Sequence, residues 1–169
     1  KGSGSVQTET RSVPSFTKIK LEVSGNIYLT QDSIQSLVVE AQESILEVLE
    51  TKVSNGKLTI DLDARCIKNY DDIKIYVSVP EIEKVKIGGS GDIYGQSAIV
   101  ANQLEFEIDG SGDIVMPQLE VNSLYTDISG SGDVEYAGTS IADYHDICIS
   151  GSGEVKAFDL PTNHVSVNI

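Results

Sequence analysis

The phrase Gly110-Ser111-Gly112-Asp113-Ile114 returns along this chain at a nearly constant step. Related phrases begin at Gly89, Gly130 and Gly151, which gives steps of 21, 20 and 21 residues. A phrase of the same form begins at Gly2, and a copy two residues shorter surrounds Gly25. Such a period indicates one structural unit repeated along the chain.

The repeat length favours strands over helices, because helical repeats need about 33 residues or more. Twenty residues of strand trace ~66 Å, which closes as about three short strands joined by corners. The sequence therefore predicts an all-β fold, a parallel β-helix (solenoid) with ~20–21 residues per coil.

Apolar residues flank each phrase and alternate with polar ones, so we expect them to stack inward. One predicted ladder contains Ile87, Ile108, Ile128, Ile149 and Ile169, and the other contains Ile93, Ile114, Val134 and Val155. The glycines between the ladders predict corners with positive φ angles. These structural turn glycines are Gly89, Gly91, Gly110, Gly112, Gly130, Gly132, Gly151 and Gly153.

We expect one domain over residues 1–169, with less regular coils in 1–84 and regular ones in 85–169. Residues 49–62 predict a hairpin, because Asn55-Gly56 favours a type I′ turn. Strands are expected over 16–23, 27–30 and 73–79, and one or two helical turns over 44–49.

Composition excludes several partners. Twenty-six acidic residues against twelve basic ones give a net charge of −14, which repels nucleic acid and anionic lipid. No apolar run approaches the ~18 residues of a membrane helix, so we expect no transmembrane segment. A basic segment followed by an apolar stretch is missing too, so a signal peptide is expected to be absent or already removed.

The sequence offers few residues for a histidine-built metal site or a Ser/His/Asp catalytic triad. Cys66 and Cys148 match no zinc spacing, which favours free thiols over a bridge, and the only histidines are His145 and His164. We expect no cofactor.

An acidic residue recurs once per repeat, at Asp92, Asp113, Asp133 and Glu154. Stacked outward, these carboxylates form a weak candidate ladder for Ca²⁺. The alternative, which we favour, is that each carboxylate accepts hydrogen bonds from backbone N–H groups of its own turn.

Tyr94 and Tyr125 point outward by the alternation and are the candidate ligand-binding residues. The alternative is that exposed tyrosines simply suit strands. A polysaccharide-active enzyme is a weaker hypothesis, because the carboxylates recur regularly, whereas a catalytic pair is usually a single break in a pattern. We therefore expect no catalysis.

The chain resembles a bacterial family of unknown function described as putative auto-transporter adhesin, head GIN domain, common in Bacteroidetes. The resemblance rests on the repeats and on matching segments elsewhere, with a shortened glycine phrase at Gly25. Those segments are Gly2-Ser3-Gly4, Thr8–Arg11, Phe16–Tyr28, Asn55–Ile60 and Val77–Pro80.

The resemblance implies a right-handed β-helix and an exported protein, often a lipoprotein, at the cell surface, anchored to the outer membrane or in the periplasm. It favours a noncatalytic interaction module, an adhesin for extracellular glycans or proteins. The alternative is a purely structural spacer of an envelope lipoprotein. Uncovered strand edges at the ends would also permit self-association.

Overall fold

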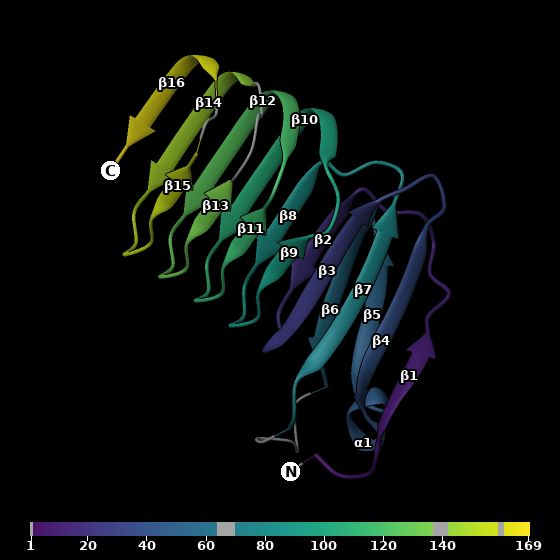
Figure 1. Cartoon of the computed structure of the whole chain (residues 1–169). Coiled ribbons are helices and arrows are strands. Elements are labelled where there is room, and N and C mark those ends of the chain that lie inside the picture. The colour runs from purple at the N-terminus through teal and green to yellow at the C-terminus, as the bar shows by residue number, and fades with distance from the viewer. Residues whose placement is uncertain (1, 64–69, 137–141, 159–160) are drawn as a thin grey trace.

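The computed structural model describes residues 2–63, 70–136, 142–158 and 161–169, which form two eight-stranded sheets and a short helix (Figure 1). The first sheet has the order β1-β4-β7-β3-β9-β11-β13-β15, and the second β16-β14-β12-β10-β8-β2-β6-β5. The first sheet comprises β1 (Val6–Thr10), β3 (Gly25–Gln31), β4 (Ser36–Gln42), β7 (Ile73–Val79), β9 (Ile93–Gly95), β11 (Ile114–Met116), β13 (Val134–Tyr136) and β15 (Val155–Ala157). The second comprises β2 (Lys18–Leu21), β5 (Leu49–Ser54), β6 (Lys57–Leu62), β8 (Lys84–Ile87), β10 (Ile99–Ile108), β12 (Leu119–Ile128), β14 (Ala142–Ile149) and β16 (Thr162–Asn168).

The all-β prediction is confirmed, but the predicted right-handed parallel β-helix with three strands per coil is wrong. Each regular repeat supplies two strands, a long one such as β10 or β12 to the second sheet and a three-residue one such as β11 or β13 to the first. Both sheets are mixed, since β1 pairs β4, β4 pairs β7 and β5 pairs β6 in antiparallel orientation. The result is two open sheets.

A polar stretch at Asn102 lies inside a long strand where three short strands per coil would require a corner. The polar pair Asn102-Gln103 interrupts the apolar alternation, yet β10 continues through it, and the pairing of β10 with β12 only skips Asn102. Nδ2 of Asn122 donates to Oδ1 of Asn102 at 2.8 Å, which links the two side chains across the strands. A polar stretch thus shifts the phase of inward positions without ending the strand.

The two interior ladders are largely as predicted. Ile87, Ile108, Ile128 and Ile149 are consecutive register partners, and so are Ile93, Ile114, Val134 and Val155. Ile169 departs from the prediction, since it is 93% exposed. Buried residues of both sheets belong to one hydrophobic cluster, so the sheets pack face to face and each keeps an outer face.

The hairpin prediction is confirmed. β5 and β6 pair antiparallel, and Asn55 (φ 51°) with Gly56 (φ 69°) supplies the two positive φ angles of a type I′ turn. The helical segment expected over 44–49 is α1 (Glu43–Leu46). No helix in the described ranges is long and apolar enough to cross a membrane.

The repeated glycines are required for close packing, and their predicted positive φ angles are wrong. Of the described glycines, only Gly4 and Gly56 have positive φ. A Cβ on Gly112 would lie 1.9 Å from the carbonyl oxygen of Gly91, and one on Gly132 would lie 1.9 Å from that of Gly112. Comparable contacts with backbone oxygen, at 1.8 to 2.6 Å, occur at Gly89, Gly91, Gly110, Gly130, Gly151 and Gly153. Stacked turns therefore touch through their backbones.

Candidate functional site

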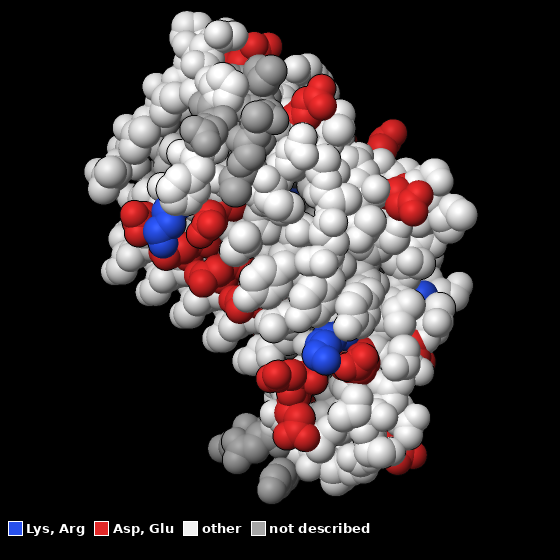
Figure 2. Space-filling model, in the orientation of Figure 1, with Lys and Arg blue, Asp and Glu red and all other residues white. Residues whose placement is uncertain are grey.

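The acidic row links successive repeats. The backbone N–H of Asp113 donates to Oδ1 of Asp92 (2.9 Å), that of Asp133 to Oδ1 of Asp113 (2.8 Å), and that of Glu154 to Oδ1 of Asp133 (2.9 Å). The prediction that each carboxylate bonds its own turn is wrong, because the donor belongs to the following repeat. Figure 2 shows acidic atoms gathered beside the short strands of the first sheet.

Some of the second carboxylate oxygens in this row are also engaged. Oδ2 of Asp92 accepts from the hydroxyl of Tyr94 (3.0 Å), and Oδ2 of Asp133 accepts from Nζ of Lys156 (3.1 Å). Within the described ranges, no three or more His, Cys, Asp or Glu residues are grouped to hold a metal ion. Calcium binding by this row stays a prediction. The hydrogen bonds show that the row joins each repeat to the next.

Asp113→Ala is expected to lower the free energy of unfolding by about 1–2 kcal/mol, because the N–H of Asp133 loses its acceptor. Asp113→Asn keeps an acceptor oxygen and is expected to stay within about 0.5 kcal/mol of wild type. Urea denaturation of both variants measures the difference. Equal losses would show that the carboxylate charge matters and not the acceptor.

Tyr94 belongs to a stacked row of tyrosines on the outer face of the first sheet. The ring of Tyr28 lies 5.2 Å from that of Tyr76 and 5.9 Å from that of Tyr94. Burial and the hydrogen bond to Asp92 raise the pKa of Tyr94 to about 12. Its ring and hydroxyl therefore already have protein partners, which makes it a poor ligand contact.

Tyr125 lies on β12 and points from the outer face of the second sheet. The side chain is 41% exposed, and none of the described aromatic rings stacks on it. The pKa of Tyr125 is raised above its ordinary value, mainly by partial burial and also by the negative charge of Asp127. The structure thus places Tyr94 and Tyr125 on outer faces of different sheets, so they cannot form one site.

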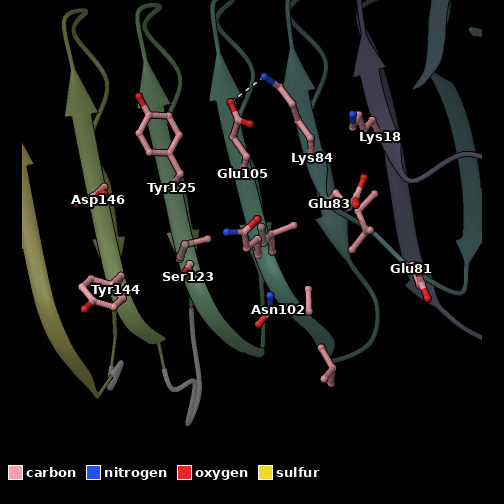
Figure 3. Close-up of a pocket in the computed structure, with 16 residues that line it drawn as sticks. Lys18, Glu81, Glu83, Lys84, Asn102, Glu105, Ser123, Tyr125, Tyr144 and Asp146 are labelled. Carbon is pink, nitrogen blue, oxygen red and sulfur yellow. Dashed lines mark hydrogen bonds and ion pairs between the residues drawn. The ribbon is translucent and has the colours of Figure 1, made fainter. Parts of the chain in front are cut away.

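Tyr125 lines a broad surface groove of about 1170 Å³ across the second sheet (Figure 3). Its walls come from β2, β8, β10, β12, β14 and the segment before β8. Side chains that line it include Lys18, Lys84, Glu105, Ser123, Tyr125 and Tyr144. Tyrosines thus lie at one end of the groove and lysines at the other.

The lysine end is held by ion pairs. Nζ of Lys84 lies 2.8 Å from Oε1 of Glu105 and 2.5 Å from Oε2 of Glu107. Partial burial opposes the charge on Lys84, but hydrogen bonds to these carboxylates outweigh it and raise the pKa of Lys84. Burial likewise opposes ionisation of Glu107, but Lys84 and Lys86 outweigh it and lower the pKa of Glu107. Both groups therefore stay charged at neutral pH.

Sequence reasoning missed Tyr144 and the lysines. Tyr144 is the register partner of Ser123, and its ring stacks on that of His164 at 5.2 Å. The alternating pairs Lys18/Lys20 and Lys84/Lys86 stand 66 residues apart, the same spacing as Gly25 and Gly91. This shared spacing of 66 residues could have predicted that β2 and β8 are neighbouring strands. Cys148 is a free thiol, as predicted, and Cys66 lies outside the described residues.

Comparisons with known proteins agree on a family and a fold. The family model described as putative auto-transporter adhesin, head GIN domain, matches residues 15–169. Crystal structures of a putative lipid binding protein and a putative adhesin from Parabacteroides distasonis superpose with TM-scores of 0.75 and 0.77 at 21% and 19% identity. Each alignment covers 98% of this chain and 79% of the other. A putative adhesin from Bacteroides fragilis gives 0.63 at 19% identity, with 99% of both chains covered. No curated protein sequence matches this chain.

Proposed function

The chain belongs to the family described as putative auto-transporter adhesin, head GIN domain, and from this premise we propose that it is a noncatalytic adhesin of the cell surface. We propose further that residues 1–169 act as one domain that binds glycans in the groove of the second sheet. An adhesin works outside the cell, which supports an exported location.

The groove with its tyrosine end is the observation that supports this function most. Tyr125 and Tyr144 are 41% and 56% exposed, and one face of a tyrosine ring is an apolar platform on which a sugar ring can lie. Ser123, Asn102 and Gln103 line the same groove with hydroxyl and amide groups. Hydroxyl and amide groups can both donate hydrogen bonds to sugar hydroxyls and accept hydrogen bonds from them. A groove that holds such groups therefore suits a sugar ligand.

Binding of purified, labelled protein to an array of glycans and extracellular matrix proteins tests this function. Tyr125→Ala is expected to weaken glycan binding about tenfold or more, since central aromatic contacts carry much of the energy of an interface. Tyr76→Ala is the matched control, because Tyr76 is also 41% exposed but lies on the first sheet.

Several results would contradict this function. If Tyr76→Ala weakened binding and Tyr125→Ala did not, the ligand would lie on the first sheet. Selective binding to matrix proteins alone would favour a protein partner. A blank array, with and without calcium, would favour the structural spacer.

A further inference from the structure

The lysines of this acidic protein are concentrated on three adjacent strands. Five of its twelve basic residues lie on β6, β2 and β8, namely Lys57, Lys18, Lys20, Lys84 and Lys86. Lys18 is the register partner of Lys57 on one side and of Lys84 on the other, and Lys20 is the partner of Lys86. Like charges on adjacent strands repel, so this arrangement needs counter-charges.

Three of the five lysines have a counter-charge within the protein. Lys84 pairs with Glu105 and Glu107, Lys86 with Glu107 and Asp109, and Lys20 with Glu22. Among the described residues, no carboxylate lies within ion-pair distance of Lys18 or Lys57. Lys18 and Lys57, which are register partners on adjacent strands, therefore have no carboxylate partner within the part of the chain that the structure describes.

These lysines also surround a hollow. A smaller cavity of about 330 Å³ is lined by Lys18, Ile19, Lys20, Lys57, Lys84, Lys86 and Glu107. It shares Lys18 and Lys84 with the large groove, so the two spaces adjoin. In Figure 3, Lys18 and Lys84 lie on the side of the groove opposite to Tyr125 and Tyr144. From β2 to β14 the groove crosses four strand spacings, or ~19 Å, which is room for a short oligosaccharide.

We propose that Lys18 and Lys57 bind the carboxylate or sulfate group of an acidic sugar whose neighbouring units lie in the groove towards Tyr125. This inference rests on the proposed function and names the class of glycan. Lysine ammonium groups pair well with such anions, and charge-assisted hydrogen bonds are the stronger kind. Glu81, Glu83 and Glu105 line the groove beside the lysines, so the anionic group must lie on the Lys57 side of Lys18. Those carboxylates accept hydrogen bonds from sugar hydroxyls instead.

The distribution of charge also restricts the ligand. A net charge of −14 repels a densely charged polyanion, and the five clustered lysines offset this repulsion locally. The expected ligand therefore carries one acidic group per few sugars, not one or more on every sugar. Heparin is expected to bind poorly.

Matched acidic and neutral saccharides test the inference. The pairs are hyaluronan tetrasaccharide with its carboxyl-reduced form, sialyllactose with lactose, and 6-sulfolactose with lactose. Wild type is expected to bind at least one acidic member about tenfold tighter than its neutral counterpart in 0.05 M NaCl, and the preference should shrink in 0.5 M NaCl. The carboxylate and sulfate pairs distinguish the two anions.

The double variant Lys18→Gln/Lys57→Gln is expected to reduce that preference to about threefold or less while binding of the neutral sugar is kept. Lys52→Gln/Lys74→Gln is the control, because it removes the same charge from lysines already paired with Glu50 and Glu40. Circular dichroism checks that all variants are folded. A preference that fell equally in the control would assign it to net charge and overturn the site.

The failures of the two proposals are distinguishable. Equal affinity of wild type for acidic and neutral members, with binding still lost in Tyr125→Ala, overturns the lysine site and leaves the glycan groove standing. Binding that depends on Lys18 and Lys57 but not on Tyr125 overturns the groove and leaves an anion site. Absence of binding to every saccharide overturns both.

Discussion

Gly112→Ala is expected to lower the free energy of unfolding by about 3 kcal/mol, among the largest losses for any single methyl group added to this protein. The new Cβ would lie 1.9 Å from the carbonyl oxygen of Gly91, and backbone cannot move aside as a side chain can. Separating the two turns would weaken the hydrogen bond from the N–H of Asp113 to Asp92 and the pairing of β11 with β9. Urea denaturation measures the loss.

Ser111→Ala is the control for this experiment. Ser111 belongs to the same turn but is exposed, and its substitution is expected to change stability by less than about 0.5 kcal/mol. Gly132→Ala repeats the test one repeat later, since its Cβ would meet Gly112. A Gly112→Ala protein as stable as Ser111→Ala would mean that the turns are not in contact.

His145→Leu is expected to stabilise the protein by about 1–2 kcal/mol at neutral pH. His145 is 2% exposed and occupies the inward register position that Leu124 occupies in the preceding repeat. Its ring meets that of Tyr136 at 5.6 Å, and Nε2 has no hydrogen-bond partner among the described residues. A leucine fills the position without an unsatisfied polar atom.

The same variant is expected to remove a pH dependence. Burial lowers the pKa of His145, and the charge of Asp146 opposes this only in part. A histidine in the unfolded chain titrates near ~6.5, so the unfolded state takes up the proton first as the pH falls. Stability is therefore complete above about pH 6.5 and declines as the pH falls from there towards the lower pKa of the folded state.

Unfolding measured between pH 5 and 7.5 checks this. The stability difference between His145→Leu and wild type should grow as the pH falls. If the curves of wild type and His145→Leu were parallel, His145 would titrate alike in both states. A less stable His145→Leu would mean that the imidazole has a partner.

The repeat period predicted the interior well, because side chains one period apart become register partners whatever the number of strands per repeat. Ile108 and Ile128 are an example, and so are Ile114 and Val134. The number of strands was not predictable in this way. Asn102-Gln103 is polar whether the chain turns a corner there or the strand continues. Only the pairing of β10 with β12 on both sides of Asn102 shows that the strand continues.

Whether the strands of the first half pair parallel or antiparallel could not be predicted from the sequence either. Alternation of apolar and polar residues is the same in parallel and antiparallel strands, so nothing in Ser36–Gln42 indicates that β4 runs against β7. The hairpin at Asn55-Gly56 was predictable because the turn itself has a chemical requirement.

The candidate site was predicted in part for a related reason. Alternation placed Tyr94 and Tyr125 outward, but assigning each to a sheet requires the number of strands in a repeat. Lys18 and Lys57 are register partners because β2 lies next to β6, an order that does not follow the chain. Long-range pairing therefore decides where the proposed ligand contacts gather.

The antiparallel strands lie towards one end of this molecule, and the parallel pairing of equivalent positions continues towards the other. In evolutionary terms, the two halves differ in whether a whole repeat can be gained or lost without disturbing the strand pairing. Gain or loss of a 20- or 21-residue segment among β10, β12 and β14 would preserve every register partner on either side, whereas no such segment exists among β3, β4 and β7. Slippage within the gene can thus lengthen or shorten the groove in steps of ~4.8 Å, and so change the room for the ligand proposed above.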